Sequence, residues 1–244
     1  MPRLEPYSKD LSYSYALGLY PSLTLMERRP ETVSRLLLSE DIPDSEGIRK
    51  LRERCAANGI REEYAEKVLK RESGKANCFA ALVFNKYNGT LRADQAHIVL
   101  CQISDAGNLG TILRSAVAFG YRNVAVIRPC VDVFEPHTIR ASMGAMFHLE
   151  LALYDSFEQY RSAFPAHELY PFMLDGAVDL DRAAPKAANR HALIFGNEAR
   201  GLEARFAALG QSVKIPQSDE IDSLNLSVAA SIAMYSFTNT KKDR

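Results

Sequence analysis

The chain has 244 residues, and its 30 basic and 30 acidic side chains leave no net formal charge at pH 7. The length is enough for two small domains or one large one, and the composition is ordinary for a soluble globular protein. Because phosphate contacts dominate binding to nucleic acids, an RNA-binding function would have to rely on local basic patches.

Several classes of protein are excluded by what the sequence lacks. No apolar run reaches the ~20 residues that a membrane span needs, and the first ten residues lack the apolar core of a signal peptide. The four cysteines are widely separated without a C-x-x-C pair, and the five histidines are scattered, so a zinc site has little support. We therefore expect a cytoplasmic protein with no membrane segment and no metal.

The first 90 residues predict a small α/β domain. Its predicted elements are a helix over 13–26, a strand over 33–38, helices over 44–57 and 62–72, and a strand over 79–84. Polar residues over 86–95 break the apolar periodicity and predict a linker. Basic residues cluster over 49–54 and 67–75, and either cluster could contact RNA or form a solvated helix face, since glutamates are interleaved in both.

After the linker, strands and helices alternate and predict a mostly parallel sheet with helices on both faces. The predicted strands cover 97–104, 123–127, 149–154, 170–174, 192–195 and 212–215. The predicted helices cover 109–119, 136–146, 157–164, 202–208 and 226–240.

Three polar turns follow predicted strands, where α/β proteins hold ligands. Residues 105–120, D-A-G-N-L-G-T-I-L-R-S-A-V-A-F-G, open a helix whose polar stripe carries Arg114. Residues 195–202, F-G-N-E-A-R-G-L, crowd polar side chains between two glycines. Residues 215–229, I-P-Q-S-D-E-I-D-S-L-N-L-S-V-A, stop a strand at a proline and offer Ser223 and Asn225 as helix caps. Taken alone, each segment also has a structural explanation. Arg114 could be a surface arginine, Glu198 could pair with Arg200, and residues 215–229 could form an ordinary capped helix.

Together the three segments resemble the SpoU/TrmH family of RNA ribose methyltransferases, in the SPOUT class. The family patterns N-x-G-x-x-x-R-x-A-x-x-F-G, F-G-N-E-x-x-G-L and I-P-x-x-x-x-x-x-S-L-N-x-S-x-A are matched over 108–120, 195–202 and 215–229. R-A-S-M-G-A over 140–145 looks like the family's link between the first two. Residues 1–90 are similar, by pattern alone, to the family's L30e-like RNA-binding domain. The resemblance implies a methyltransferase domain over 96–244 with a deep trefoil knot, a rare exception among folds.

The resemblance further implies methyl transfer from S-adenosylmethionine to a ribose 2′-OH of ribosomal or transfer RNA, carried out by a homodimer in which an arginine reaches the partner's cofactor. That arginine is Arg114, which would clamp a phosphate or stabilise the developing alkoxide while a phosphate takes the proton, since guanidinium stays protonated. The other residues implied in the reaction are Asn108, Glu198, Ser223 and Asn225. The residues implied to hold the cofactor are Leu174, Phe195, Gly196, Asn197, Ile215, Gln217 and Leu224.

One loop departs from the family pattern. Family members usually carry methionine after the I-P and glycine two residues later, where this chain has Gln217 and Asp219. The change could alter how the methionine end of the cofactor is held, or which RNA enters. It also supports an alternative, a knotted RNA-binding protein that has lost catalysis, as does the neutral charge. A dinucleotide-dependent dehydrogenase, suggested by the glycine turns, lacks the G-x-G-x-x-G motif.

Overall fold

The computed structural model describes residues 4–74, 77–218 and 220–239, and the chain divides into two compact units. The first unit combines the described residues up to Tyr87 with Asp132–His148, and the second combines Asn88–Val131 with the described residues from Leu149 onward. Residues 132–148, which lie within the domain predicted over 96–244, belong to the first of these two units.

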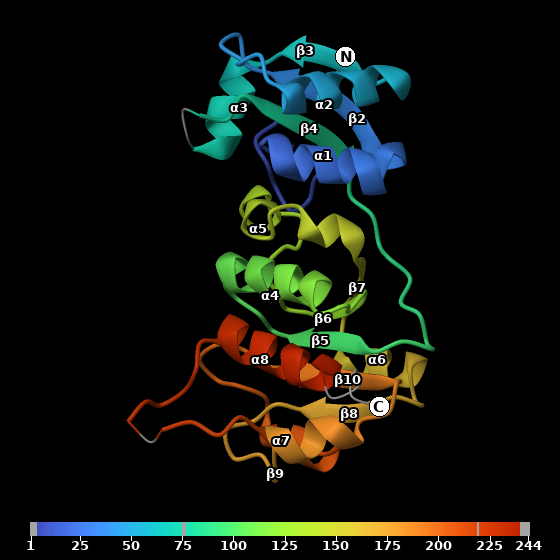
Figure 1. Cartoon of the computed structure of the whole chain (residues 1–244), viewed down its shortest axis with the longest axis vertical. Helices are drawn as coiled ribbons and strands as arrows, with labels where there is room; N and C mark the ends of the chain where they lie inside the picture. The colour runs from blue at the N-terminus through green and yellow to red at the C-terminus, as the bar shows by residue number, and fades with distance from the viewer. Residues whose placement is uncertain (1–3, 75–76, 219, 240–244) are drawn as a thin grey trace. The chain divides into compact units, whose positions relative to one another are not determined.

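The first unit is built on a four-stranded mixed sheet in the order β1-β4-β2-β3. Figure 1 labels three of these strands, β2, β3 and β4. β4 pairs antiparallel with both β1 and β2, and β3 pairs parallel with β2. Its strands are β1 (Tyr13–Leu17), β2 (Val33–Leu38), β3 (Arg61–Tyr64) and β4 (Ala80–Asn85). Its helices are α1 (Leu19–Arg28), η1 (Pro30–Thr32), α2 (Glu46–Ala57), α3 (Glu66–Ser73), α5 (Pro136–Ala141) and η2 (Ala145–His148).

Two helices predicted in this unit are partly wrong. The predicted helix over 13–26 begins instead as strand β1, and the predicted helix over 62–72 contains strand β3 before α3 starts. Both strands gain ladder hydrogen bonds from a neighbour that lies far away in the sequence, β1 from β4 and β3 from β2. Such pairing overrides local helix propensity, which is worth only a few tenths of a kcal/mol per residue.

Residues 132–148 join the first unit because their apolar side chains are buried against its sheet. Phe147 packs edge-on against Phe84 of β4, with ring centroids 5.4 Å apart. The buried Ser14 hydroxyl of β1 donates a hydrogen bond to the carbonyl of Phe134 at 2.5 Å. The Tyr7 hydroxyl donates to the carboxylate of Asp132. Hydrophobic burial and polar satisfaction therefore both hold this segment in place.

The second unit contains a five-stranded sheet in the order β7-β6-β5-β10-β8, and every pairing in it is parallel. The predicted parallel sheet is confirmed. Its strands are β5 (His97–Cys101), β6 (Asn123–Ile127), β7 (Glu150–Tyr154), β8 (Glu168–Pro171) and β10 (His191–Phe195). A small parallel pair is formed by β9 (Val178–Asp179) and β11 (Val213–Lys214). The helices are α4 (Ala106–Ala118), α6 (Phe157–Ala163), α7 (Leu180–Ala183), η3 (Ala184–Lys186), η4 (Ala204–Ala208) and α8 (Leu226–Asn239).

Helices cover both faces of this sheet, as predicted. On one face α4 and α8 pack together, and Phe237 of α8 meets the rings of Tyr170 and His191 at 5.0 and 5.3 Å between centroids. On the other face Phe157 of α6 and Phe206 of η4 pack in one cluster with buried residues of the strands, namely Val99, Ala125, Ile127, Ala152 and Ile194. Strands buried on both sides are typical of parallel sheets.

The strand order of this sheet reverses at β5. The chain passes from β5 to β6 to β7 in one direction, whereas β10 and β8 lie on the other side of β5. In such sheets ligands bind beyond the carboxyl ends of the strands, where the order reverses. Residues 86–96 contain no helix or strand, as expected for a linker. Within the described ranges, no helix has the length and apolarity to cross a membrane.

Candidate active site

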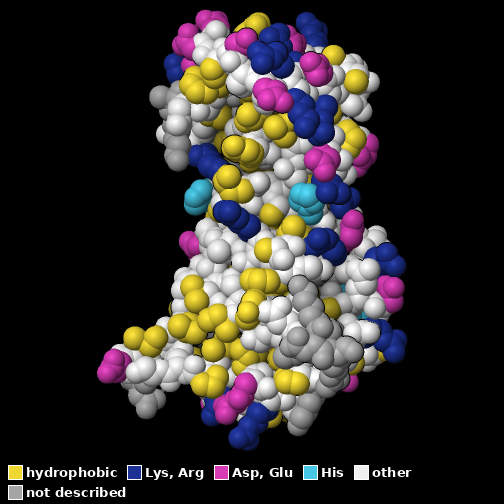
Figure 2. Space-filling view, viewed as in Figure 1, with side chains coloured by type: hydrophobic (Ala, Val, Ile, Leu, Met, Phe, Trp, Pro, Cys, Tyr) yellow, Lys and Arg dark blue, Asp and Glu magenta, His cyan; other side chains and the backbone are white. Residues whose placement is uncertain are grey.

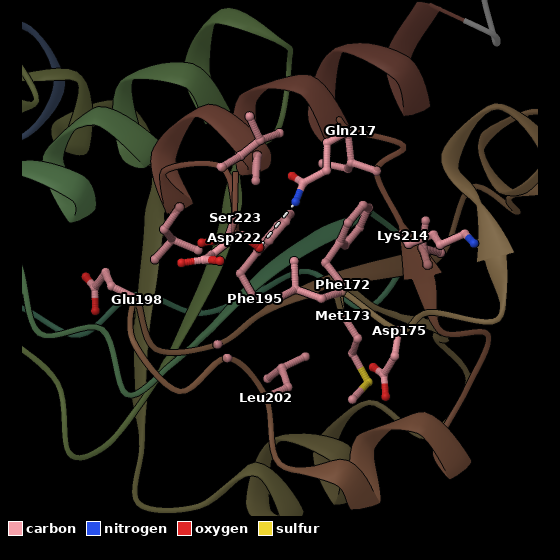
Figure 3. A pocket seen from close by; sticks show the side chains of 18 of the residues that line it. Phe172, Met173, Asp175, Phe195, Glu198, Leu202, Lys214, Gln217, Asp222 and Ser223 are labelled. Atoms are coloured by element: carbon pink, nitrogen blue, oxygen red, sulfur yellow. Dashed lines mark hydrogen bonds between the residues drawn. The ribbon is translucent and has the colours of Figure 1, made fainter. Parts of the chain in front are cut away.

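A cavity of about 820 Å³ lies at the carboxyl edge of the second unit's sheet, within the range of about 300–1,000 Å³ typical of small-molecule sites. It is enclosed by the loops after β8, β10 and β11 and by the start of α8 (Figure 3). Nine of the residues singled out from the sequence line it: Leu174, Phe195, Gly196, Asn197, Glu198, Ile215, Gln217, Ser223 and Leu224.

The cavity combines an aromatic base with apolar side chains at its rim. Phe172 stacks on Phe195, with centroids 4.8 Å apart and planes 20° apart. Leu174 and Ile221 also line the cavity, yet they remain 69% and 50% exposed. Apolar side chains left open at the mouth of a pocket offer surface that a ligand can cover.

The loop after β10 is tight, and its glycines are required by geometry. A Cβ atom at Gly196 would lie 2.3 Å from the carbonyl carbon of Gly201, which itself has φ +68°. The backbones of Asn197 and Gly201 exchange two hydrogen bonds, at 3.2 and 2.9 Å. The side-chain oxygen of Asn197 accepts from the N–H groups of Ala199 and Arg200 at 3.0 and 3.2 Å. This loop is therefore a closed turn with little freedom.

Glu198 ties this loop to the turn between β5 and α4. Its carboxylate accepts hydrogen bonds from the N–H and hydroxyl of Ser104 at 3.2 and 2.8 Å and from the N–H of Asp105 at 3.1 Å. The side-chain amides of Asn108 and Asn197 also donate to it, at 3.4 and 3.2 Å. Burial raises the pKa of this carboxyl, but backbone N–H groups and the Ser104 hydroxyl outweigh that effect and hold the pKa below its ordinary value.

A chain of side-chain amides extends the same network to α8. The amide nitrogen of Asn225 donates to the side-chain oxygen of Asn108 at 3.0 Å, across 117 residues of sequence. The Asn225 oxygen accepts from the N–H groups of Ser227 and Val228 and so caps α8. Ser223, the other predicted cap, is exposed on the cavity wall instead. The structure thus joins Asn108, Glu198 and Asn225, one residue from each motif.

The cavity lining omits three of the predicted site residues, Asn108, Asn225 and Arg114. Asn108 and Asn225 reach Glu198 through the hydrogen-bond network, whereas Arg114 does not. Arg114 is exposed on α4, is not a lining residue, and has no hydrogen bond or ion pair within the described part of the chain. The next residue, Ser115, shares a hydrogen bond of 2.8 Å with Ser231 of α8. Helix α4 is therefore held against α8, while the guanidinium of Arg114 is open to a partner outside this chain.

The loop that departs from the family pattern is held by its own side chains. The side-chain amide of Gln217 donates to the carbonyl of Asp222 at 3.4 Å, as Figure 3 shows. The Ser218 hydroxyl accepts from the N–H of Glu220 at 3.2 Å. Asp219 lies outside the described residues. The substituted loop is thus ordered on both sides of that position and still closes the cavity.

A family model described as the SpoU rRNA Methylase family matches residues 95–235, more than half of the chain. This chain belongs to the SpoU rRNA methylase family. The matched range contains the whole network that joins Asn108, Glu198 and Asn225 as well as the cavity.

Relatives of this SpoU-family chain carry methyltransferase names. It is 31% identical, over 57% of its length and 51% of the relative's, to a Synechocystis protein named uncharacterized tRNA/rRNA methyltransferase. It is 28% identical, over 59% and 53%, to the 23S rRNA (uridine(2479)-2'-O)-methyltransferase of Streptomyces viridochromogenes. The chain spans about half the length of these relatives.

A solved structure reproduces the fold of nearly the whole SpoU-family chain. The AdoMet-bound rRNA methyltransferase of Sinorhizobium meliloti superposes with a TM-score of 0.80 at 24% identity, over 93% of this chain and 87% of that one. At this identity the likeness shows the fold and no more.

Sequence reasoning missed part of the cavity wall. Phe172, Met173 and Asp175 line the cavity. The first two were predicted to belong to a strand over 170–174 and not to a ligand site. β8 ends at Pro171, and beyond it the N–H groups of Phe172 and Met173 donate to the carbonyls of Ile194 and Val213 at the carboxyl edge. Proline inside a predicted strand was the signal that could have found them, because it interrupts a ladder. Among the described residues no group of three or more His, Cys, Asp or Glu could hold a metal ion.

Proposed function

We propose that this SpoU-family chain transfers a methyl group from S-adenosylmethionine to a ribose 2′-OH of ribosomal or transfer RNA. The observation that carries the proposal is the network of Asn225, Asn108 and Glu198, which gathers the three motif segments beside one cavity. The names of the relatives support the reaction and the two RNA classes.

The cavity fits S-adenosylmethionine. The exposed surface of Leu174 and Ile221 suits a flat, apolar adenine ring, and the carboxylates of Asp175 and Asp222 suit the cationic end of an amino acid. The residues that we propose to hold it are Leu174, Phe195, Gly196, Asn197, Ile215, Gln217 and Leu224. When bound, the cofactor supplies an activated methyl group on a sulfonium. The protein then has to orient the hydroxyl and direct its proton.

The residues of the network would orient the ribose hydroxyl and would not accept its proton. Glu198 already accepts five hydrogen bonds and its pKa is lowered, which makes it a poor base and a good anchor. Asn108 and Asn225 would hold the ribose edge of the site. The hydroxyl of Ser223 has no hydrogen bond to any described residue and faces the cavity, so it is open to the substrate. The proton would leave to a phosphate oxygen of the RNA.

Arg114 would act at the reacting oxygen, by clamping that phosphate bidentately or by stabilising the oxygen as negative charge develops on it. Because Arg114 lies outside its own cavity, we propose that a second copy of the chain brings it to the site. Val228 and Tyr235 of α8 are 46% and 55% exposed. Figure 2 shows apolar side chains gathered on the side of the second unit where Figure 1 places α8. We propose α4 and α8 as the homodimer face.

We also propose a trefoil knot in the second unit, an RNA-binding role for the first unit and a cytoplasmic location. The trefoil knot is supported by the tight passage of β11 against the loop after β8, where a Cβ at Gly176 would lie 2.4 Å from the carbonyl carbon of Val213. The first unit would be the RNA-binding domain, supported by its α/β architecture. A cytoplasmic location is supported by the four cysteines, none of which forms a disulfide within the described part of the chain.

The decisive experiment is transfer of labelled methyl from S-adenosylmethionine to total bacterial RNA, followed by nuclease digestion and nucleoside analysis. We expect the label in a 2′-O-methyl nucleoside. Label in a base-methylated nucleoside would refute the ribose as acceptor. No label and no cofactor binding would favour the non-catalytic RNA-binding alternative.

A further inference from the structure

Arg200 is a charged residue at the cavity that no step above uses. The cavity lining contains two cations, Arg200 and Lys214. Lys214 pairs with Asp179 at 3.5 Å, and Figure 3 shows its side chain directed away from the centre of the cavity. Arg200 is exposed, and none of the residues described in the structure gives its guanidinium a hydrogen bond or ion pair. It is therefore the one unpaired cation among the described lining residues.

The acidic neighbours of Arg200 are already occupied. The sequence left open a pair between Glu198 and Arg200, but Glu198 is taken up by five donors from the β5–α4 turn and the loop itself. Glu203, three residues beyond, pairs with Arg205 at 2.8 Å. A guanidinium placed between two acids that are both engaged elsewhere keeps all five of its donors available.

The backbone beneath Arg200 is rigid. Its N–H donates to the side-chain oxygen of Asn197 at 3.2 Å, and the next residue closes the turn with Gly201 N–H bound to the Asn197 carbonyl at 2.9 Å. Because the turn is fixed before any ligand arrives, ordering the side chain costs less on binding than it would on a mobile loop.

Resting on the proposed function, we infer that Arg200 binds a phosphate of the RNA strand next to the methylated nucleotide and so positions the ribose at the cavity. A phosphodiester matches the forked donors of an unpaired guanidinium. The chain has no net charge, so phosphate binding requires local cations that are free of acidic partners. The rim also carries the exposed carboxylates of Asp175 and Asp222, which repel phosphate, so Arg200 marks where a strand can approach.

The test compares Arg200→Gln and Arg200→Lys with Arg161→Gln as a matched control. Arg161 on α6 is likewise exposed and unpaired among the described residues, but it is not part of the cavity lining. Binding of bacterial ribosomal RNA is measured over a salt series, and KM and kcat are measured for methyl transfer. For Arg200→Gln we expect RNA affinity to fall roughly tenfold and the slope of log K against log salt to shrink by about 0.7, with cofactor affinity unchanged. Arg200→Lys should keep the slope and lose part of the affinity.

Two outcomes would overturn the inference. One is an Arg200→Gln protein whose salt slope and KM match those of Arg161→Gln. The other is weakened cofactor binding with an unchanged RNA slope, which would assign Arg200 to the carboxylate of the cofactor. Failure of the proposed function is distinguishable, because wild-type protein would then bind RNA without transferring methyl, and the salt slope would still decide the role of Arg200.

Discussion

Replacing Glu198 by alanine should loosen the junction of the β10 loop with the β5–α4 turn. The substitution leaves five donors without their acceptor, two of them part-buried side-chain amides and three exposed groups of Ser104 and Asp105. We expect a loss of about 3 kcal/mol of unfolding free energy, because the part-buried bonds contribute about 1 kcal/mol each and water partly replaces the exposed ones. Methyl transfer should fall further than stability, since Asn108 loses its anchor.

Urea unfolding followed by circular dichroism measures this loss, with Glu203→Ala as the control. Glu203 lies on the same stretch of chain, but its carboxylate makes only an exposed pair with Arg205, and exposed ion pairs contribute little to stability. A Glu198→Ala protein as stable as the control, with undiminished methyl transfer, would show that the network neither holds the site nor orients it.

The lowered pKa of Glu198 fixes the sign of the pH dependence. The carboxyl in the folded protein ionises below its ordinary value of 4.5, so the unfolded chain binds the proton more readily. The stability that the carboxylate contributes is fully present above that ordinary value and is lost as pH falls through the lower folded pKa. The difference in stability between wild type and Glu198→Ala should therefore become smaller as the pH falls below 4.5.

Three further predictions follow from single contacts. Gly196→Ala places a Cβ 2.3 Å from the backbone of Gly201, so we expect more than about 2 kcal/mol of destabilisation and loss of cofactor binding by calorimetry. Asn225→Ala removes the cap of α8 and should cost about 1 kcal/mol in urea unfolding, whereas Ser223→Ala, which removes no cap, should cost little. Burial lowers the pKa of His97 to about 4, so stability should fall as pH drops from 6.5 towards 4, and an unchanged slope in His97→Gln would contradict this origin.

The site could be predicted from the sequence only as three separate turns. Each motif is local, and its glycine, proline or cap residues predict the turn that the structure contains. The contacts between Asn108 and Glu198 and between Asn108 and Asn225 span 90 and 117 residues. No periodicity reports them, since they arise because β5 and β10 are neighbours in the sheet. Family resemblance, rather than local physics, supplied that link.

The errors in the predicted helices and strands also arise from contacts between segments that are distant in the sequence. A helix predicted over 136–146 ends at Ala141, because Met143 and Gly144 adopt φ of 53° and 79° and the chain turns into η2. A Cβ on Gly144 would lie 2.8 Å from the Cα of Pro21, so α1 approaches this turn closely. Such a close approach is set by packing between distant segments, which sequence periodicity does not describe.

The position of Arg114 predicts that a complete site needs two chains. Arg114→Ala should abolish methyl transfer and leave cofactor binding intact, because the residue does not line its own cavity. Leu224→Arg should block the cavity, which Leu224 lines, and leave Arg114 unchanged. If the arginine acts on the partner's cavity, mixing the two inactive proteins after reversible unfolding should restore up to about a quarter of wild-type activity, since about half the dimers would hold one intact site. Absence of any recovery, with mixed dimers shown by mass spectrometry, would place Arg114 at the cavity of its own chain.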